Sequence, residues 1–291
     1  MNLVQAVVLG VVQGLTEFLP ISSSGHLEIV GQALLGSRPG AAFIAVSQLG
    51  TMAAVLVYFR SDLVEMTRAF FRGLTDPDAR RTTEYRLAWY IGLGTVPIVV
   101  AGIAFKDAIE AGQTLRVIAS ALIVLGLILL AAEGVGRRTR DIETLTLKDG
   151  LFIGTAQAMA LVPGVSRSGS TLTAGLFLGL ERAAAARYSF LLSVPAVVLS
   201  GLFQLRNIGE SGGAGPAATA VATLLAFASG YLAIAGLLKY LSTHSTLVFV
   251  VYRVALGIVV LVMVSAGILD NRSCPDRTEK GCEIPTMEAA R

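Results

Sequence analysis

The chain has 291 residues, of which 54% are hydrophobic and only 15% are Asp, Glu, Lys or Arg, and its mean hydropathy is +0.71. Soluble domains carry about a quarter charged residues, so this composition excludes an ordinary soluble enzyme and indicates a membrane protein. The net charge of +3 comes from basic residues spread over several loops, which makes nucleic acid an unsuitable partner and leaves membrane lipids as the expected surroundings.

The first 35 residues are apolar but match neither a cleavable signal peptide nor a simple span. No basic residue precedes the apolar stretch, and Glu17 and Pro20 interrupt it. Pro20 ends a helix because it lacks an amide donor and clashes with the preceding turn. A cluster of small polar residues follows directly: Ser22, Ser23, Ser24 and Gly25. We therefore expect two half-helices that meet at a polar break.

The polar residues at this break suggest chemistry. Gln13 and Glu17 share one helical face, and a carboxylate at membrane depth is costly and usually functional. Carboxylate and carbonyl oxygens suit a divalent cation, Mg²⁺ or Ca²⁺, so Glu17 is a candidate metal ligand with Gln13 beside it. The alternative is a Glu17 that only hydrogen-bonds the serines or caps a helix. The serines would cap the next half-helix, whose free amides favour an anion.

His26 is one of two histidines in the chain and follows the serine cluster directly. Beside Glu17 and the serine hydroxyls it is a candidate nucleophile, general base or general acid. A purely structural histidine is the alternative.

Six later stretches approach the length of about 20 residues that a helix needs to cross the hydrocarbon layer. They are Ala41–Phe59, Leu87–Phe105, Val117–Ala132, Tyr188–Leu205, Gly212–Leu238 and Leu247–Leu269. Helices are expected because lipid offers no water to backbone polar groups. The last stretch holds a single charge, Arg253, which we expect near enough to one end to extend toward the headgroups.

The connections between these stretches predict an orientation. Arg60–Arg86 and Gly136–Gly150 are rich in arginine, which marks the cytoplasmic side, whereas Lys106–Arg116 and Arg206–Pro216 contain fewer basic residues. The last span then ends outside.

The polar tail, residues 270–291, would accordingly face an oxidising compartment. Its two cysteines, Cys274 and Cys282, are then expected to form a disulfide, with two free thiols as the alternative.

The stretch Leu151–Leu180 repeats the pattern of the first segment. Gly10-Val-Val-Gln13 and the later Pro-Ser break match Gly154-Thr-Ala-Gln157 followed by Pro163-Gly-Val-Ser166. Three spans separate the two copies, so they would enter the membrane from opposite faces. Paired broken segments of inverted topology indicate a site near the midplane. Two kinked ordinary spans without a pocket are the alternative.

The predicted fold is all-α and integral to the membrane, with six transmembrane helices plus two re-entrant helical hairpins in an inverted-topology repeat. A single domain would cover residues 1–269, with repeat one at about 1–135 and repeat two at about 150–269.

The second break resembles a phosphate cradle. The Arg167 guanidinium is a permanently charged planar fork that fits phosphate oxygens. The hydroxyls and amides around it would complete the binding site: Ser166, Ser168, Gly169 and Thr171. Alternatively, Arg167 only neutralises Glu17.

Two runs, Gly10–Leu27 and Pro163–Gly169, resemble the signature motifs of the undecaprenyl-diphosphate phosphatase family of the bacitracin-resistance type. The run Ser189–Pro195 also fits, and the likeness covers nearly the whole chain except the tail. The resemblance implies a bacterial inner-membrane phosphatase, dependent on a divalent cation, that converts undecaprenyl diphosphate to the monophosphate at a site open to the periplasm. A homodimer is compatible with it.

By position in these motifs, Ser23, His26 and Arg167 match residues important for the family's activity, with Ser166 and Thr171 in support. Gln13 stands where other members carry a second Glu. The nucleophile is either Ser23 with His26 as base or His26 itself. A rival function is a secondary transporter or lipid flippase, which shares the inverted repeat but needs no nucleophile.

Overall fold

The computed structural model describes residues 1–36, 39–105, 109, 114–204, 215–269 and 271. Within these residues every regular element is a helix, and one isolated β-bridge joins Arg140 to Leu180. The predicted disulfide between Cys274 and Cys282 lies outside the described residues.

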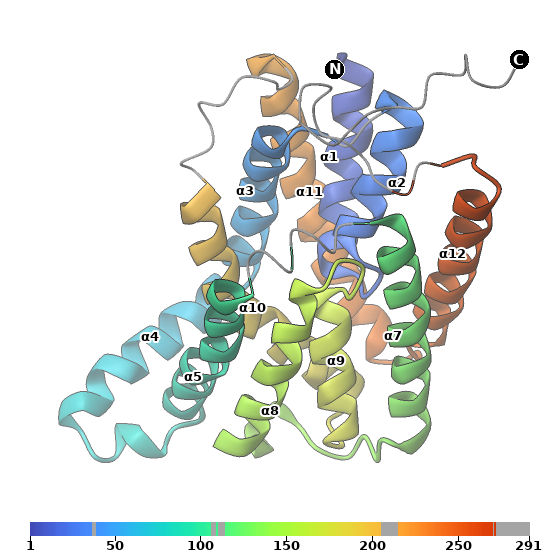
Figure 1. Cartoon of the computed structure of the whole chain (residues 1–291). Coiled ribbons are helices and arrows are strands. Elements are labelled where there is room, and N and C mark those ends of the chain that lie inside the picture. The colour runs from blue at the N-terminus through green and yellow to red at the C-terminus, as the bar shows by residue number, and fades with distance from the viewer. Residues whose placement is uncertain (37–38, 106–108, 110–113, 205–214, 270, 272–291) are drawn as a thin grey trace, which may run out of the picture.

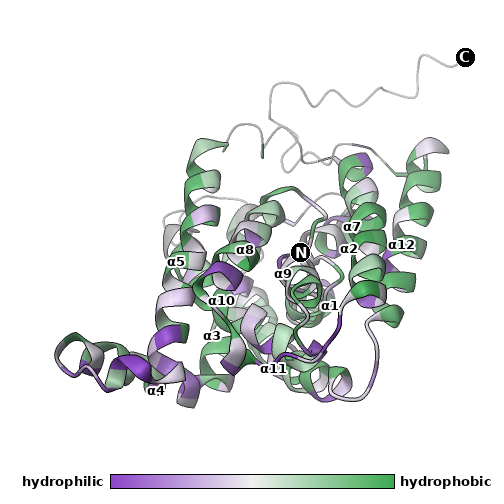
Figure 2. Ribbon diagram, turned by 90° about the horizontal axis from the view of Figure 1, so that it is seen from below, coloured by the Kyte–Doolittle hydropathy of each residue, from purple (hydrophilic) through white to green (hydrophobic). Residues whose placement is uncertain are grey.

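The six charge-poor stretches are confirmed as helices. They are α3 (Ala41–Tyr58), α5 (Thr83–Ala104), α7 (Leu115–Val135), α10 (Arg182–Gln204), α11 (Pro216–Leu241) and α12 (Leu247–Ser265). Five of them have the length and composition to cross a membrane, and α3 qualifies as a sixth only together with the helix that follows it at a bend of 70°. Their outer faces are apolar, as side chains such as Ile103, Leu224 and Leu232 are more than two thirds exposed. Such a surface suits contact with lipid (Figure 2).

The two broken segments form matching helix–break–helix units. The first contains α1 (Leu3–Phe18) and α2 (Ser23–Leu35), and the second contains α8 (Leu147–Ala158), η3 (Met159–Leu161) and α9 (Arg167–Phe177). In Figure 1, α1 begins and α2 ends at the upper end of the molecule, whereas α8 begins and α9 ends at the lower end. The two breaks therefore approach each other from opposite sides, halfway through the helix bundle.

The breaks have the same local structure. Ser22 and Ser166 are the N-caps of α2 and α9, and each accepts a hydrogen bond from the backbone amide three residues later. Both caps have positive φ, 75° and 27°, a backbone conformation that L-residues rarely adopt. Strain of this kind persists only where the surroundings hold it, and it is concentrated at functional sites.

Glycines allow each broken segment to pack backbone to backbone on a helix from the other half of the chain. A Cβ at Gly10 of α1 would lie 2.5 Å from the carbonyl oxygen of Ala222 in α11. A Cβ at Gly154 of α8 would lie 2.6 Å from the Cα of Gly94 in α5. The approach of α1 to α11 and of α8 to α5 holds both breaks at the centre.

The connection Arg60–Arg86, expected from its polarity to be a loop, contains a helix, α4 (Arg60–Thr75). Its charged residues alternate with apolar ones at helical spacing, which is typical of an amphipathic helix. The number of arginines alone had indicated only a polar connection. Helix α4 extends away from the other helices (Figures 1 and 2) and is held by an ion pair between Asp62 and Arg187 of α10. Arg80 closes its C-terminal end by donating to the carbonyl of Gly73 at 2.7 Å.

Partly buried ion pairs join the lower ends of the helices. Glu133 of α7 accepts hydrogen bonds from Arg138, from Arg182 of α10 and from Thr246 at the start of α12. Arg140 pairs with Asp149 of α8 at 2.7 Å, and the carboxylate raises the pKa of Arg140 above its ordinary value. These contacts fix where α8 and α12 begin.

Candidate functional site

A cavity of about 690 Å³ lies where the two breaks meet. Its volume is typical of a small-molecule or cofactor site. One end is polar and combines seven residues from both segments: Gln13, Glu17, Ser22, Ser23, Ser24, Ser166 and Arg167. The rest is mainly apolar and is formed by α3, α5 and α10, with side chains that include Ile98, Val99 and Val197. The cavity is therefore amphipathic, with a charged end and an apolar wall.

An ion pair joins the two segments at the polar end. The Arg167 guanidinium lies 2.6 Å from Glu17 Oε1, across 150 residues of sequence. The two side chains are only 17% and 9% exposed, so each charge compensates the other in surroundings that would otherwise disfavour both. The contact between Arg167 and Glu17, which the sequence offered as the alternative to phosphate binding, is therefore present and is compatible with it.

The second oxygen of Glu17 binds the serine cluster. Ser23 Oγ donates to Glu17 Oε2 at 2.9 Å, and Gln13 Nε2 donates to the same oxygen at 3.3 Å. A carboxylate that already accepts a serine proton in a hydrogen bond is placed to take that proton when the oxygen attacks an electrophile.

His26 lies apart from this cluster. Its Nδ1 is 2.7 Å from the carbonyl oxygen of Ser22, and its Nε2 is 2.7 Å from the hydroxyl of Tyr252 in α12. A carbonyl oxygen only accepts, so Nδ1 carries the proton and Nε2 accepts from Tyr252 in the neutral ring. The residues that line the cavity do not include His26. The expected pairing of His26 with Ser23 is therefore not seen in the described structure.

The other predicted residues support the breaks from behind. Ser24 lines the cavity, and its Oγ lies 3.2 Å from Ser22 Oγ. The backbone amide of Gly25 donates a hydrogen bond to Ser22 Oγ. Ser168 Oγ donates to the carbonyl of Leu19 at 3.1 Å, which links the second break to the first.

On α9, the Gly169 amide donates to Ser166 Oγ at 3.1 Å, and Thr171 is fully buried. The Thr171 hydroxyl donates to the carbonyl of Arg167 at 2.8 Å and contacts Ser189. Gly169 and Thr171, like Ser168, are not among the residues that line the cavity, and their hydrogen bonds support Arg167 and Ser166.

Arg253 corrects the sequence-based expectation. It was predicted to reach the headgroups, but it is 1% exposed and points into the bundle. Its guanidinium donates to the carbonyl oxygen of Pro20 at 3.0 Å and to that of Gly164 at 3.4 Å. A lone charge in an apolar stretch was the available signal, because such residues usually face the interior of a bundle.

The donor set around Glu17 offers little to a metal ion by itself. No group of three His, Cys, Asp or Glu side chains suited to a metal occurs among the described residues. Gln13 Oε1 is buried and has no hydrogen-bond partner there, so it and Glu17 provide two oxygens on one helical face. Magnesium binds to proteins through one or two carboxylates with water and substrate phosphates as the remaining ligands, and the two oxygens fit that pattern.

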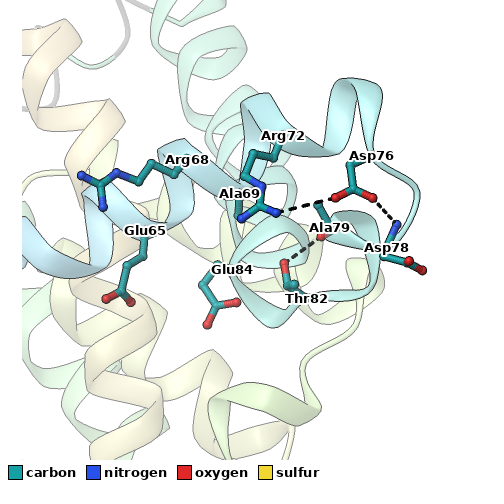
Figure 3. Close-up of a pocket in the computed structure, with 9 residues that line it drawn as sticks. All are labelled: Glu65, Arg68, Ala69, Arg72, Asp76, Asp78, Ala79, Thr82 and Glu84. Carbon is teal, nitrogen blue, oxygen red and sulfur yellow. Dashed lines mark hydrogen bonds and ion pairs between the residues drawn. The ribbon is translucent and has the colours of Figure 1, made fainter.

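A second hollow, of about 520 Å³, lies between α4 and the start of α5 (Figure 3). Arginines and carboxylates such as Arg68, Glu65 and Glu84 line it, and Arg72 pairs with Asp76 at 3.8 Å. It is lined by charges of both signs, contains no serine and shares no residue with the central cavity.

The fold and the cavity together define a multi-pass helical membrane protein with an ion pair, Glu17–Arg167, between two facing helix breaks. More specifically, the chain belongs to the family described as "Bacitracin resistance protein BacA", whose family model matches residues 6–259. The family resemblance predicted from the motifs is thereby confirmed.

Individual relatives agree over nearly the whole length. The chain is 53% identical over 282 residues to an undecaprenyl-diphosphatase of Myxococcus xanthus (strain DK1622), covering 96% of this chain and 95% of that protein. It is 52% identical to an undecaprenyl-diphosphatase of Mycobacterium sp. (strain KMS), over 92% of this chain and 99% of the relative. A third undecaprenyl-diphosphatase, from Thermobifida fusca (strain YX), is 47% identical over 99% of both chains.

Proposed function

We propose that the chain is a phosphatase that hydrolyses undecaprenyl diphosphate to undecaprenyl phosphate and inorganic phosphate. The observation that supports this most directly is that Ser23 hydrogen-bonds Glu17 and Glu17 pairs with Arg167 inside one cavity. It combines an activated hydroxyl, a base and a phosphate-binding cation. The relatives named above have this activity in their names and match this chain almost end to end.

The order of events follows from the chemistry of these groups. The terminal phosphate of the diphosphate binds Arg167, which leaves Glu17 free to act as a base. Ser23 Oγ attacks the terminal phosphorus, its proton passes to Glu17, and the bond to the bridging oxygen breaks, so that undecaprenyl phosphate leaves. Water then attacks the phosphoserine, Glu17 returns the proton to the departing Ser23 oxygen, and inorganic phosphate carries the protons of the water away, which restores Ser23 and the Glu17 carboxylate.

This order uses Ser23 as nucleophile and Glu17 as base. The distances favour it over the alternatives with His26 as base or nucleophile, because both His26 nitrogens are engaged by Ser22 and Tyr252. Phosphoryl transfer depends mostly on positioning and charge stabilisation, and Arg167, whose side chain is largely buried, serves both needs.

We propose further that the activity depends on a divalent cation, Mg²⁺ or Ca²⁺. Glu17 and the unpartnered Gln13 oxygen would hold it together with the diphosphate oxygens. A bound cation would supply charge neutralisation for the phosphates. With Gln13 in place of a second Glu, the protein provides one negative charge, so we expect weak affinity for the cation until the substrate binds.

The arrangement in the membrane is also a proposal. We propose that α1–α2 and α8–α9 are re-entrant hairpins of an inverted repeat, since their ends lie at opposite ends of the bundle (Figure 1). The protein would lie in the bacterial inner membrane. Cavity residues on α3, α5 and α10 belong to the ends of these helices remote from the arginine-rich connections, which supports access from the periplasmic side.

The test is phosphate release from undecaprenyl diphosphate by the detergent-purified, lipid-supplemented protein, in Mg²⁺, in Ca²⁺ and in EDTA. Release by the wild type should be lost in EDTA and in Glu17→Ala and Arg167→Ala, because each change removes a charge that the transferred phosphoryl group needs. Full activity in EDTA would reject the proposed metal dependence but not the proposed phosphatase activity. No release by folded wild type would reject the phosphatase and favour a transporter or flippase that uses the same cavity.

A further inference from the structure

Two adjacent residues of α12, Tyr252 and Arg253, contact the breaks of both broken segments. Arg253 is the only charged residue in α12 and is among the largest fully buried side chains of the described chain. A buried guanidinium in a membrane-spanning helix is unfavourable unless its donors are satisfied. Its partners are therefore informative.

Those partners are the two carbonyls that the breaks leave free. Pro20 O and Gly164 O lie two residues before the caps Ser22 and Ser166, and one guanidinium donates to both, at 3.0 and 3.4 Å. Backbone groups released by a helix break at membrane depth need protein partners. A single planar side chain thus ties the first segment to the second at equivalent positions.

Tyr252 makes the companion contact. Its hydroxyl lies 2.7 Å from His26 Nε2, and the two rings stack with centroids 5.6 Å apart. His26 in turn contacts the carbonyl of Ser22 through Nδ1 at 2.7 Å. The positive φ of Ser22 is therefore held by groups on both sides, from Pro20 through Arg253 and from its own carbonyl through His26.

The lack of a side chain at Gly169 makes room for the Arg253 guanidinium. A Cβ at Gly169 of α9 would lie 2.5 Å from Arg253 Nη1, so the glycine allows the guanidinium to pass between the breaks. The residues that line the central cavity include Ser23 and Arg167 but not Tyr252 or Arg253. The α12 pair therefore acts from behind the site.

We propose that Tyr252 and Arg253 are positioning residues that fix the distance between the Ser23 hydroxyl and the Arg167 guanidinium. This inference rests on the proposed phosphatase activity. Ser23 and Arg167 each follow directly after a cap that the α12 pair supports. We call these two residues, Tyr252 and Arg253, the clamp. Loosening the clamp would separate the nucleophile Ser23 from the phosphate-binding Arg167 without removing either.

Arg253→Met and Arg253→Lys test the clamp in the full-length, detergent-purified protein. Methionine removes both hydrogen bonds at similar length, and we expect kcat to fall about a hundredfold with KM changed less than about threefold, as for a misplacement near 1 Å. Lysine can reach one carbonyl at a time, and we expect a smaller loss, about tenfold. Thermal unfolding and size-exclusion profiles of the same samples give the folded fraction.

The matched control is Arg182→Met, which removes a part-buried arginine that ties α10 to Glu133 at the lower end of the bundle. It should lower the melting temperature and leave kcat per folded molecule within about twofold. The clamp is overturned if Arg253→Met, corrected for its folded fraction, keeps kcat within the same twofold range. If Arg253→Met does not fold, the lysine variant decides: folded Arg253→Lys with wild-type kcat overturns the clamp. Inactive wild type would instead reject the phosphatase.

Tyr252→Phe has its own control in Tyr188→Phe. The Tyr188 hydroxyl is buried and has no hydrogen-bond partner among the described residues, so its removal should leave kcat unchanged. Removing the Tyr252 hydroxyl should lower kcat about tenfold at unchanged melting temperature, because His26 loses the group that orients its ring. Equal kcat values for the two phenylalanine variants would remove Tyr252 from the proposal.

Discussion

The two oxygens of the Glu17 carboxylate have different partners, so this one side chain connects the two broken segments at the site. One oxygen pairs with Arg167 and the other accepts from Ser23 and Gln13. The ion pair compensates two charges that would each be costly in isolation in these largely buried surroundings. When a phosphate competes for Arg167, Glu17 is left with the serine proton as its nearest positive partner. In the mechanism proposed above, phosphate binding therefore starts the reaction.

The identity of the nucleophile follows at the same scale. With substrate radiolabelled in the terminal phosphate, we expect a trapped phosphoenzyme that survives acid, as phosphoserine does and phosphohistidine does not. His26→Asn should still form it, whereas Ser23→Ala should not. Ser47→Ala, which alters a buried serine that only donates to Ile44, is the matched control and should label like wild type. An acid-labile label that disappears in His26→Asn would reverse the assignment.

Glu17→Gln tests the base. The glutamine keeps the shape of the side chain but removes the negative charge that receives the proton, and general-base catalysis contributes about 10²–10⁴-fold to a rate. We therefore expect kcat to fall by about that factor. The measurement is steady-state phosphate release, with Gln48→Glu, a change on the cavity wall, as a check that altering a cavity charge is not itself the cause. A Glu17→Gln enzyme within tenfold of wild type would exclude Glu17 as the base.

At the scale of elements, the breaks are held by close packing of helices from opposite halves of the chain. Helix α1 packs on α11 and α8 packs on α5, and in both pairs a glycine lets backbones touch. Without a hydrophobic driving force between helices in lipid, such close approach is a main source of their association. Helix α12 adds the polar clamp through Arg253.

Gly10→Ala should therefore destabilise the fold. Its Cβ would lie 2.5 Å from the backbone oxygen of Ala222, which a side-chain rotation cannot relieve, and overpacking of this kind costs about 1–3 kcal/mol. Gly236→Ala in α11 is the control, since a Cβ there meets nothing within 4 Å and alanine favours a helix by up to about 1 kcal/mol. The comparison of thermal midpoints in detergent is decisive, and a stabilised Gly10→Ala would show that α1 and α11 separate in solution.

At the scale of the whole molecule, charge and cavity position agree on one orientation. The arginine-rich connections gather at the lower end of the bundle (Figure 1). The cavity-lining residues of α3, α5 and α10 lie in the halves of these helices that are remote from those connections. Lys and Arg remain on the cytoplasmic side during insertion, which would leave the cavity accessible from the periplasm.

Labelling in intact cells checks this orientation. In a background with Cys274 and Cys282 replaced by serine, a cysteine at Gly36 should react with a membrane-impermeant maleimide, and one at Asp141 should react only after lysis. Both positions are exposed, so burial does not explain a difference. The reverse pattern would place the cavity on the cytoplasmic side.

Local features of the chain determined much of this protein. Stretches of about 20 residues with no charge, or with the single charge Arg253 in the last, predicted α3, α5, α7, α10, α11 and α12, because burial in lipid selects composition along a continuous segment. The proline–serine breaks predicted the half-helices, and the isolated Glu17 and Arg167 marked the site, because a buried charge is too costly to occur without a purpose.

Only the tertiary structure decided which groups meet. Glu17 faces a partner 150 residues away, and His26 turns to Tyr252, 226 residues away, instead of to its neighbour Ser23. Arg253 was placed wrongly from its position near a helix end, because the carbonyls that hold it belong to breaks in two other segments. Rotamers and contacts between distant helices depend on packing in three dimensions, for which the spacing of residues along the chain contains no signal.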